Sequence, residues 1–426
     1  MRNILFLLAC LSTTWLVAQS PVPAPAQAQP IAITGATAHL GNGEVIENAL
    51  ITFAEGKLTQ VTTYRNGADL SGHQVIDAAG KHVYPGLIAP NSQLGLVEIG
   101  AVRATRDESE TGEMNPNVRS LIAFNTDSQV SPTVRSRGVM LTQATPDGGT
   151  IAGQSSVMHL DGWNWEDAAV RADDGVHVYW PRRYRYNWRT GELMENRRYS
   201  ETIQELQRFL DEARAYCAGD HAERNLKLEA MCGVMSGERN FYVHADMARD
   251  IEQAVVMARA NNLSLVIVGG AESFMITDLL RDNDVAVIVG PTHALPSRED
   301  YDVDQPFKTP AMLHEAGVRF CLSQEGFWEQ RNLPFMAGTA VAYGLPYEEA
   351  IRALTLSTAE ILGVNDRVGS LEAGKDATLI VCAGDLLDMR TSQVERAFIE
   401  GRDIDLDNKQ DYLYRKFSEK YSREQD

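Results

Sequence analysis

The sequence predicts an α/β protein, with a (β/α)₈ barrel and a small β-module built from both ends of the chain. Apolar strands alternate with amphipathic helices over residues 85–365, which is typical of a parallel sheet covered by helices. Short strands and turns fill residues 31–84, and strands return over residues 366–405. About 280 residues of strand–helix alternation fit a closed barrel of eight strands.

An open, doubly wound sheet is the alternative arrangement for the central residues. Such sheets carry a glycine-rich phosphate loop after an early strand, and no such loop follows an early strand here. The pattern therefore favours the barrel.

The first 20 residues have the layout of a secretory signal peptide. Arg2 precedes an apolar run over residues 4–18, and small or polar residues follow at positions 19–20. We therefore expect an exported protein, either periplasmic or secreted. A lipoprotein signal with Cys10 as the lipidated residue is the alternative, but the apolar run continues past Cys10, which disfavours it.

The β-module surrounds the barrel in the sequence. Residues 21–30 alternate Pro, Ala and Gln and are expected to form an extended linker before it. Its predicted strands are residues 31–34, 49–53, 58–61, 368–371, 377–381 and 394–399. We expect residues 368–371 and 377–381 to form a hairpin. The charged tail, residues 406–426, is expected to form a surface helix.

The barrel region contains several clear helices and strands. The predicted helices are residues 202–216, 251–261, 278–283, 309–316 and 346–362. The predicted strands between them are residues 263–268, 285–290 and 318–322. Pro310 is expected in the first turn of its helix, and Gly363 is expected to close the last one.

Charge and cysteine content restrict the partners and the redox state. The formal net charge is −19, which excludes nucleic acid and anionic membrane surfaces as expected partners. No membrane-spanning run follows the signal peptide. Cys217 and Cys232 are near enough in the sequence to pair in an oxidising compartment. Free, buried thiols at all four positions, with Cys321 and Cys382, are the alternative.

Four motifs carry a family resemblance. Residues 83–88 read Val-Tyr-Pro-Gly-Leu-Ile, and residues 138–154 place Gly-Gly-Thr-Ile-Ala-Gly-Gln after an apolar strand. Residues 309–318 and 368–377 are more specific, and the second includes a Gly-Lys-Asp turn. Together they resemble the amidohydrolase superfamily, especially its imidazolonepropionase-like branch, over nearly the whole mature chain. The resemblance implies a barrel that holds one or two divalent metals, such as zinc, and hydrolyses non-peptide C–N bonds.

The resemblance also implies a set of metal ligands, from which this sequence departs. Asn91 and Gln93 occupy both positions of the family's His-x-His pair, and Gly269 occupies the position of the sixth-strand histidine. His244 matches the fifth-strand histidine, and Glu325 stands at the eighth-strand aspartate. Amides bind transition metals poorly, and a tight site needs three or four good ligands. We therefore expect the metal to be weakly bound or absent.

His244 and Glu325 are the candidate catalytic residues. Each is placed at a strand end, where barrel enzymes keep their active sites. For His244 the alternative is a structural hydrogen bond between strand ends. Asn91, Gln93 and Gly269 mark a candidate pocket for a small-molecule ligand in the barrel mouth.

A basic, aromatic segment stands out in this acidic chain, and we call residues 179–199 the arginine island. Its candidate interface residues are Trp180, Arg182, Arg183, Tyr184 and Arg185. Trp, Tyr and Arg are the residues that dominate binding energy at protein interfaces. A solvated surface loop is the alternative, and so is an internal contact with the acidic run at residues 107–113.

Two functions remain open at this point. The first is a C–N hydrolase that uses His244 and Glu325 with an atypical or absent metal. The second is a catalytically silent pseudoenzyme that binds a ligand, forms a homo-oligomer or pairs with an active amidohydrolase paralogue. The incomplete ligand set favours the second function, because a fold does not guarantee an activity.

Overall fold

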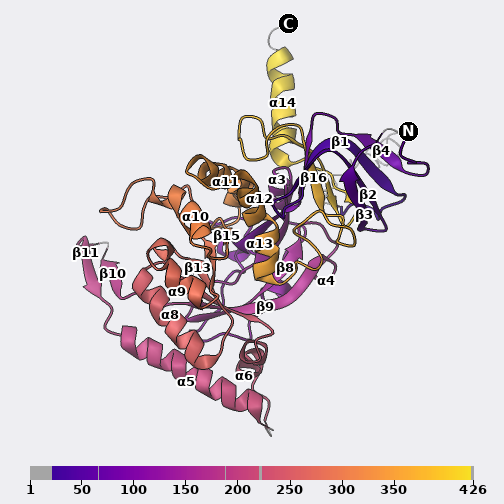
Figure 1. Cartoon of the computed structure of the whole chain (residues 1–426). Helices are drawn as coiled ribbons and strands as arrows, with labels where there is room; N and C mark the ends of the chain where they lie inside the picture. Colours follow the sequence, from indigo (N-terminus) through magenta and orange to yellow (C-terminus); the bar gives the residue numbers. More distant parts are fainter. Residues whose placement is uncertain (1–21, 66, 188, 220–222, 424–426) are drawn as a thin grey trace, which may run out of the picture.

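The structure, a computed structural model, describes residues 22–65, 67–187, 189–219 and 223–423 (Figure 1). The predicted signal peptide, with Cys10, lies outside these residues. The described chain folds into a barrel and a β-module, each with its own hydrophobic core.

The β-module is discontinuous in the sequence, as predicted. Its strands follow the order β18-β17-β16-β5-β1-β2-β3, and β4 pairs with β1. The two chain ends meet where β5 pairs antiparallel with β16. The strands are β1 (Ile31–His39), β2 (Val45–Ala54), β3 (Lys57–Thr63), β4 (Gln74–Asp77), β5 (His82–Pro85), β16 (Leu379–Cys382), β17 (Val394–Ile399) and β18 (Arg402–Asp403).

The predicted hairpin between residues 368–371 and 377–381 is wrong. Residues 368–371 form bends, and β16 pairs instead with β17 and β5. Leu371 still packs in the core of the module and donates its N–H to the Leu40 carbonyl. Burial of apolar side chains in this segment therefore reflects packing and not a strand.

Residues 22–30 are extended, as predicted for a linker, but they are bound to the protein surface. The Gln27 amide donates to the Phe53 carbonyl at 2.9 Å, and its oxygen accepts the Gly56 N–H at 3.0 Å. Ala24 donates its N–H to Asp161 at 3.1 Å. These bonds anchor the segment to the β-module and to the barrel.

The barrel sheet has eight strands in the order β15-β14-β13-β12-β9-β8-β7-β6, as the sequence predicts for a TIM-like barrel. It is nearly closed, because no ladder joins β15 to β6 in the described part of the chain. Its strands are β6 (Leu87–Ser92), β7 (Val139–Ala144), β8 (Ile151–His159), β9 (Ala169–Tyr179), β12 (Asn240–Ala245), β13 (Leu265–Gly269), β14 (Ala286–Val289) and β15 (Phe320–Leu322).

One strand departs from the all-parallel pattern. β8 runs antiparallel to both β7 and β9. Residues 145–150 are all that connects β7 to β8, and a parallel connection needs a crossover of a dozen or more residues. The short connection therefore forces the chain to reverse.

The helices agree with the sequence pattern with three differences. α10 begins one turn earlier than predicted, with Pro306 in its first turn, so Pro310 lies inside the helix. The predicted helix over residues 346–362 is two helices, broken at Thr355. α11 was not predicted. The principal helices are α5 (Tyr199–Ala218), α8 (Ala248–Asn261), α9 (Thr277–Asp282), α10 (Gln305–Glu315), α11 (Leu333–Ala342), α12 (Tyr347–Leu354), α13 (Leu356–Leu362) and α14 (Lys409–Arg423).

Shorter helices occur in the connections. These are η1 (Arg103–Thr105), α2 (Ser120–Ala123), α3 (Ser131–Arg135), α4 (Trp165–Ala168), α6 (Leu226–Ala230), α7 (Cys232–Met235), η2 (Ser273–Met275) and η3 (Glu329–Asn332). Cys217 in α5 and Cys232 in α7 form a disulfide, whereas Cys321 and Cys382 are free and buried. α14, the predicted tail helix, extends away from the body (Figure 1). No helix in the described ranges has the length and apolar character that a membrane span requires.

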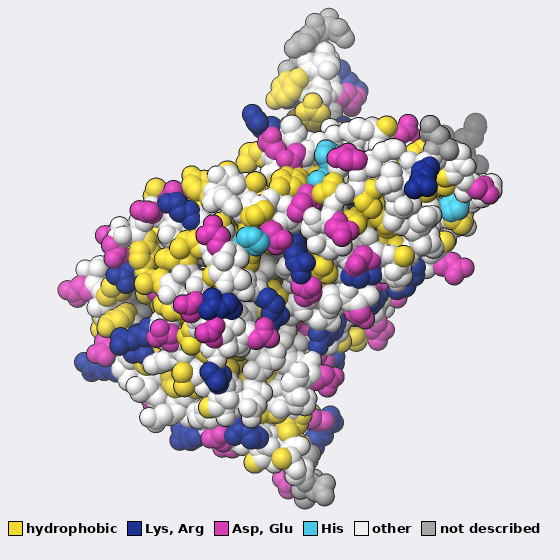
Figure 2. All heavy atoms as spheres, in the orientation of Figure 1, with side chains coloured by type: hydrophobic (Ala, Val, Ile, Leu, Met, Phe, Trp, Pro, Cys, Tyr) yellow, Lys and Arg dark blue, Asp and Glu magenta, His cyan; other side chains and the backbone are white. Residues whose placement is uncertain are grey.

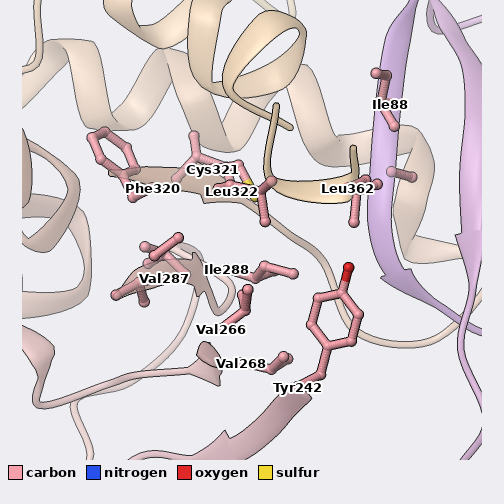
Figure 3. Packing of buried hydrophobic residues seen from close by; sticks show 14 of the residues in the cluster. Ile88, Tyr242, Val266, Val268, Val287, Ile288, Phe320, Cys321, Leu322 and Leu362 are labelled. Carbon is pink, nitrogen blue, oxygen red and sulfur yellow. The ribbon is translucent and has the colours of Figure 1, made fainter. Parts of the chain in front are cut away.

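The interior of the barrel is filled by side chains from the strands. Figure 3 shows Val266 and Val268 of β13 and Ile288 of β14 close together beside Tyr242 of β12. These residues are almost completely buried. Because the barrel centre is packed and solid, a site for a ligand must lie at the ends of the strands.

Candidate functional site

A cavity of about 240 Å³ opens where β12, β13, β14 and β15 end. The carboxyl ends of barrel strands are where enzymes of this architecture place their active sites. The cavity is lined by Asp246, Gly269, Ala271, Val289, Gly290, Pro291, Ala294, Leu295, Pro296, Ser297, Tyr301, Gln305, Pro306, Thr309 and Glu325. Its lining is therefore largely apolar, with two carboxylates.

Asp246 is the first of these carboxylates. It follows β12 directly and is exposed to solvent at the cavity. Although water reaches the residue, the surrounding protein still partly desolvates the carboxyl and raises its pKa above the ordinary value. The hydrogen bond from the Ala271 backbone and the charge of Arg182 oppose that shift.

Gly269, at the end of β13, lies directly against Asp246. Its backbone has a φ of +95°, and a Cβ built there would stand 2.5 Å from Asp246 Oδ1. A side chain at position 269 would therefore have to displace the Asp246 carboxyl. Where the family resemblance implies a histidine, this chain places a carboxylate from the neighbouring strand.

Glu325 provides the second carboxylate of the cavity. It follows β15 by three residues, and its side chain is exposed. The next residue, Gly326, accepts the Gln93 N–H through its carbonyl at 3.1 Å. Gln93 thus connects the end of β6 to the loop that presents Glu325.

His244 lies on β12, inside the barrel mouth, and contacts a second histidine. Its Nε2 is 2.8 Å from Nδ1 of His177 on β9. The Tyr179 ring stacks on His244 with centroids 4.0 Å apart. His177 continues the chain of contacts, since its Nε2 is 2.8 Å from the Ser155 hydroxyl.

The donor and acceptor roles in this series of hydrogen bonds follow from Asp174, which lies at its far end. The Ser155 hydroxyl donates to Asp174 Oδ1 at 2.7 Å, so Ser155 must accept from His177 Nε2–H. In a neutral His177, Nδ1 is then an acceptor, and His244 Nε2–H donates to it. In this arrangement His244 Nε2 carries a proton and offers no lone pair of its own.

Burial keeps both imidazoles neutral. Desolvation lowers the pKa of His244 from 6.5 to about 3. Desolvation, with the charge of His244, lowers the pKa of His177 well below 6.5. A histidine with so low a pKa is a weak base at neutral pH. The catalytic role of His244 stays a prediction.

Asp174 is the acceptor at the inner end of this hydrogen-bonded network. It is fully buried, and its Oδ2 accepts the Tyr242 hydroxyl at 2.6 Å and the Gln143 amide at 2.8 Å. Burial raises the pKa of Asp174, and the hydrogen bonds from Tyr242, Ser155 and Gln143 oppose that rise. Each polar group here has a partner, as burial requires.

The two amide positions of β6 do not form a symmetrical pair. Asn91 has a left-handed backbone with φ of 50°, within a register shift between Ala89 and Ser92. Its N–H donates to Gln143 Oε1 at 3.0 Å. The strand ends at Ser92, so Gln93 lies beyond the ladder. Asn91 and Gln93 therefore lack the regular alternation that brings two ligands to one face of a strand.

The donor set of the mouth does not fit a transition metal. Across the described residues, no group of three or more His, Cys, Asp or Glu side chains is arranged to hold a metal ion. Asn91, Gln93 and Gly269 provide no imidazole or carboxylate, and His244 donates to His177. Three or four good ligands are needed for tight zinc binding.

Several residues of the barrel mouth were not predicted from the sequence. Asp246 stands two residues after His244, and a family-based search for ligands passes over it. His177 lies in the alternating run Gly175-Val176-His177-Val178, where its partner cannot be identified. An alternating polar residue in an apolar strand was the available signal for His177, whereas Gln143, Ser155 and Asp174 each stand beside another polar residue and lack that signal.

Some residues of the arginine island are buried, and others are exposed at the surface. Trp180 is buried at 6% exposure, so its ring is not available to a partner, contrary to the predicted interface role. Arg183 pairs with Asp250 at 3.4 Å, whereas Arg182 and Tyr184 are exposed. The side chain of Arg185 lies outside the description.

The acidic run and His293 have local partners. In the run, Glu108 pairs with Arg106. The alternative of an internal contact between the acidic run and the island stays untested. His293 is exposed, and its Nε2 is 2.7 Å from the Thr339 hydroxyl.

Comparisons with known proteins agree with this architecture. The profile of the amidohydrolase family matches residues 192–405. Amidohydrolase tasK from Hapsidospora irregularis is 23% identical over 423 residues, which cover 89% of this chain. The chain spans 41% of the length of that relative.

Solved structures share the whole fold. An amidohydrolase from Thermotoga maritima MSB8 is 25% identical, with a TM-score of 0.76, and the match covers 88% of this chain and 99% of that one. A putative prolidase from Bifidobacterium longum is 17% identical, with a TM-score of 0.56 and coverage of 89% and 95%. A molinate hydrolase is 15% identical, with a TM-score of 0.57 and the same coverage. The last two are similar in fold alone.

Proposed function

The chain belongs to the amidohydrolase family, and from that premise we propose that it binds a small cationic or N–H-donating ligand without a transition metal. The ligand occupies the cavity between Asp246 and Glu325. The observation that carries this proposal is the position of Asp246, whose carboxyl fills the space beside Gly269 where a histidine is implied. A carboxylate there presents negative charge to the ligand directly.

The chemistry of the lining supports this class of ligand. Pro291, Leu295 and Val289 provide apolar surface, and the two exposed carboxylates accept hydrogen bonds. Charge-assisted hydrogen bonds to an ammonium or amidinium group are stronger than bonds between neutral groups. The small volume suits a compact molecule with one apolar body and one polar end.

The metal-free part of the proposal is tested by elemental mass spectrometry. Purified chain is loaded with zinc, manganese or iron, exchanged into metal-free buffer, and compared with His244→Ala. We expect substoichiometric metal in both proteins, because the donor set is incomplete. Near-stoichiometric metal that is lost in His244→Ala would overturn it and favour a metal-dependent hydrolase.

The binding part is tested by calorimetric titration with benzylamine and benzamidine. Benzyl alcohol, which has a similar apolar body and no charge, is the matched control ligand. We expect the cations to bind and Asp246→Asn/Glu325→Gln to weaken them at least about tenfold, which corresponds to about 1.4 kcal/mol. Equal binding of benzyl alcohol and the cations would contradict the role of the carboxylates.

Metal-free hydrolysis is a second candidate function, and the two carboxylates favour it. Asp246 has a raised pKa, so it is more readily protonated than an ordinary aspartate, and Glu325 lines the same cavity. Paired carboxylates with different environments serve as general acid and general base. Release of nitroaniline from small acyl nitroanilides, abolished in Asp246→Asn, would establish this activity. The absence of release at high enzyme concentration leaves binding alone.

A further inference from the structure

A second cavity, of about 460 Å³, opens beside the disulfide between Cys217 and Cys232. Both cysteines are partly exposed to solvent. The cavity is lined by Arg214, Cys217, Ala218, Cys232, Gly233, Met235, Ser236 and Glu238. Its volume lies in the range that admits a small molecule. Such a molecule can therefore reach the disulfide in the folded protein.

The cavity lies where the end of α5 meets α6 and α7, and both short helices pack against α5. α5 follows the hairpin of β10 (Tyr184–Asn187) and β11 (Glu192–Glu195) and ends one residue after Cys217. Figure 1 shows α6 beside the lower end of α5. In Figure 2 this end of the molecule shows positive, negative and apolar side chains mixed together. A mixed surface of this kind suits a small polar molecule, because protein partners favour broad apolar patches.

The two segments that the disulfide joins are also held by other contacts. Leu210 of α5 is fully buried in the barrel core, and so are Met231 and Val234 at α7. The Tyr216 hydroxyl accepts the Asn225 N–H at 3.1 Å, which connects α5 to the start of α6. Core packing and this hydrogen bond do not depend on the disulfide. Cleavage of the S–S bond therefore leaves both segments packed in place.

The two free cysteines of the described chain are not able to react with this disulfide. Cys321 on β15 and Cys382 on β16 are fully buried. Desolvation raises the pKa of Cys321 to about 12 and raises the pKa of Cys382 above its ordinary value. The thiolate is the species that attacks a disulfide, and neither cysteine forms much thiolate at neutral pH. Exchange at Cys217–Cys232 thus requires a thiol from outside the chain.

We propose that Cys217–Cys232 is a thiol-exchange site, at which a small-molecule thiol reacts with the folded protein. The thiolate of the small molecule attacks one sulfur of the disulfide, which forms a mixed disulfide and releases the other cysteine as a thiolate. A second thiolate then attacks the small molecule's sulfur in the mixed disulfide and releases the remaining cysteine. The small-molecule thiol is oxidised to its own disulfide and gives up two electrons, and the protein disulfide accepts them. The site is independent of the cavity between Asp246 and Glu325.

Alkylation of the native chain tests the proposal, with the buried thiols as an internal control. Purified chain is incubated with dithiothreitol without denaturant, alkylated with N-ethylmaleimide and analysed by peptide mapping. We expect label on Cys217 and Cys232 while Cys321 and Cys382 stay unlabelled, and label on all four in urea. If all four react at one rate under native conditions, or if none reacts, the disulfide opens only when the chain unfolds, and the proposal is overturned.

The route through the cavity is tested by filling its wall. Ala218→Trp places a large ring there, and Ala215→Trp, at an exposed alanine one turn earlier in α5, is the matched control. We expect Ala218→Trp to slow native reduction by dithiothreitol at least about fivefold, because exchange depends on access to the sulfurs, and Ala215→Trp to change it less than about twofold. Equal rates in the two variants would exclude this cavity as the route.

The double variant Cys217→Ser/Cys232→Ser tests whether the chain stays folded without the S–S bond. We expect circular dichroism to show a folded protein at room temperature with a lower Tm than the wild type, because the disulfide restricts the unfolded chain. An unfolded double variant would show that the fold depends on the disulfide, and exchange in the folded protein would then be excluded.

Discussion

On one side of the barrel mouth, strands β7, β8, β9 and β12 hold a single hydrogen-bonded network of Gln143, Ser155, Asp174, His177 and the partly exposed His244. On the other side, Asp246 follows β12 and Glu325 lies three residues beyond β15, and both carboxylates face an open cavity. We call these the closed half and the open half. In the closed half polar groups satisfy one another, so they stabilise the fold. In the open half they remain available to a ligand. The family's chemistry should therefore be sought at Asp246 and Glu325.

Substitution of Asp174, the buried carboxylate of the closed half, is expected to have the largest effect on stability. Asp174→Ala leaves the Ser155 and Tyr242 hydroxyls without their acceptor, and each buried unsatisfied group costs about 1–3 kcal/mol. We expect the free energy of unfolding to fall by about 3 kcal/mol or more, measured by urea denaturation. Asp246→Ala is the matched variant in the open half, with an expected loss below about 1 kcal/mol. Equal losses would remove the distinction between the halves.

His177 and His244, both desolvated by the surrounding protein, predict an acid-dependent loss of stability. Each is neutral when folded but takes up a proton when unfolded below its ordinary pKa of 6.5. The unfolded state therefore binds more protons as the pH falls from 6.5 toward about 3, and the free energy of unfolding decreases over that range. The slope is up to about 1.4 kcal/mol per pH unit for each histidine.

His177→Gln/His244→Gln tests this slope. We expect the double variant to be less stable at pH 7 but flatter between pH 6.5 and the acid limit of the measurement. His314→Gln, a half-exposed histidine of α10, is the control and should keep the wild-type slope. An unchanged slope in the double variant would mean that other groups carry the proton uptake.

A comparison of Gly269→Ala with Gly43→Ala separates the cost of backbone strain from the cost of displacing Asp246. Both have positive φ, +95° and +98°, but a Cβ at Gly43 meets no atom within 4 Å. We expect Gly269→Ala and Gly43→Ala to lose a similar stability, about 1–2 kcal/mol, because Asp246 can move its exposed carboxyl. Benzamidine binding should weaken only in Gly269→Ala. Equal binding in both variants would mean that the position of Asp246 does not matter.

Glu325→Gln has the smallest expected effect on folding. The side chain is exposed, so the free energy of unfolding should change by less than about 0.5 kcal/mol. Binding of benzamidine should nonetheless weaken, since one of the two negative charges is removed. A large loss of stability would assign Glu325 to the fold and not to the site.

The sequence predicted the barrel, the discontinuous β-module and the family, because alternation and turn residues act locally. That Asn91, Gln93 and Gly269 break the family's ligand set stays a prediction. The sequence did not predict that β8 runs antiparallel to its neighbours. Strand direction depends on the length of the connection between β7 and β8, and the ends of that connection were not recognised in the sequence. Nor did it predict that Thr355 would divide the last helix.

The site was harder to predict because its contacts are long-range. His244 was identified by position, but its partner His177 is 67 residues away on another strand. Desolvation, which makes His244 a weak base, depends on packing that a single sequence does not reveal. The Asp246 carboxyl can occupy its position at the cavity only because Gly269 has no side chain beside it.

The contact between Gly269 and Asp246 restricts how this chain can evolve. A histidine at position 269 would meet the Asp246 carboxyl first, so that substitution is disfavoured until Asp246 has changed. Changing Asp246 first removes one carboxylate of the proposed ligand site. The cost of a side chain at position 269 therefore depends on which residue stands at position 246, and we expect the two positions to be coupled in a double-mutant cycle.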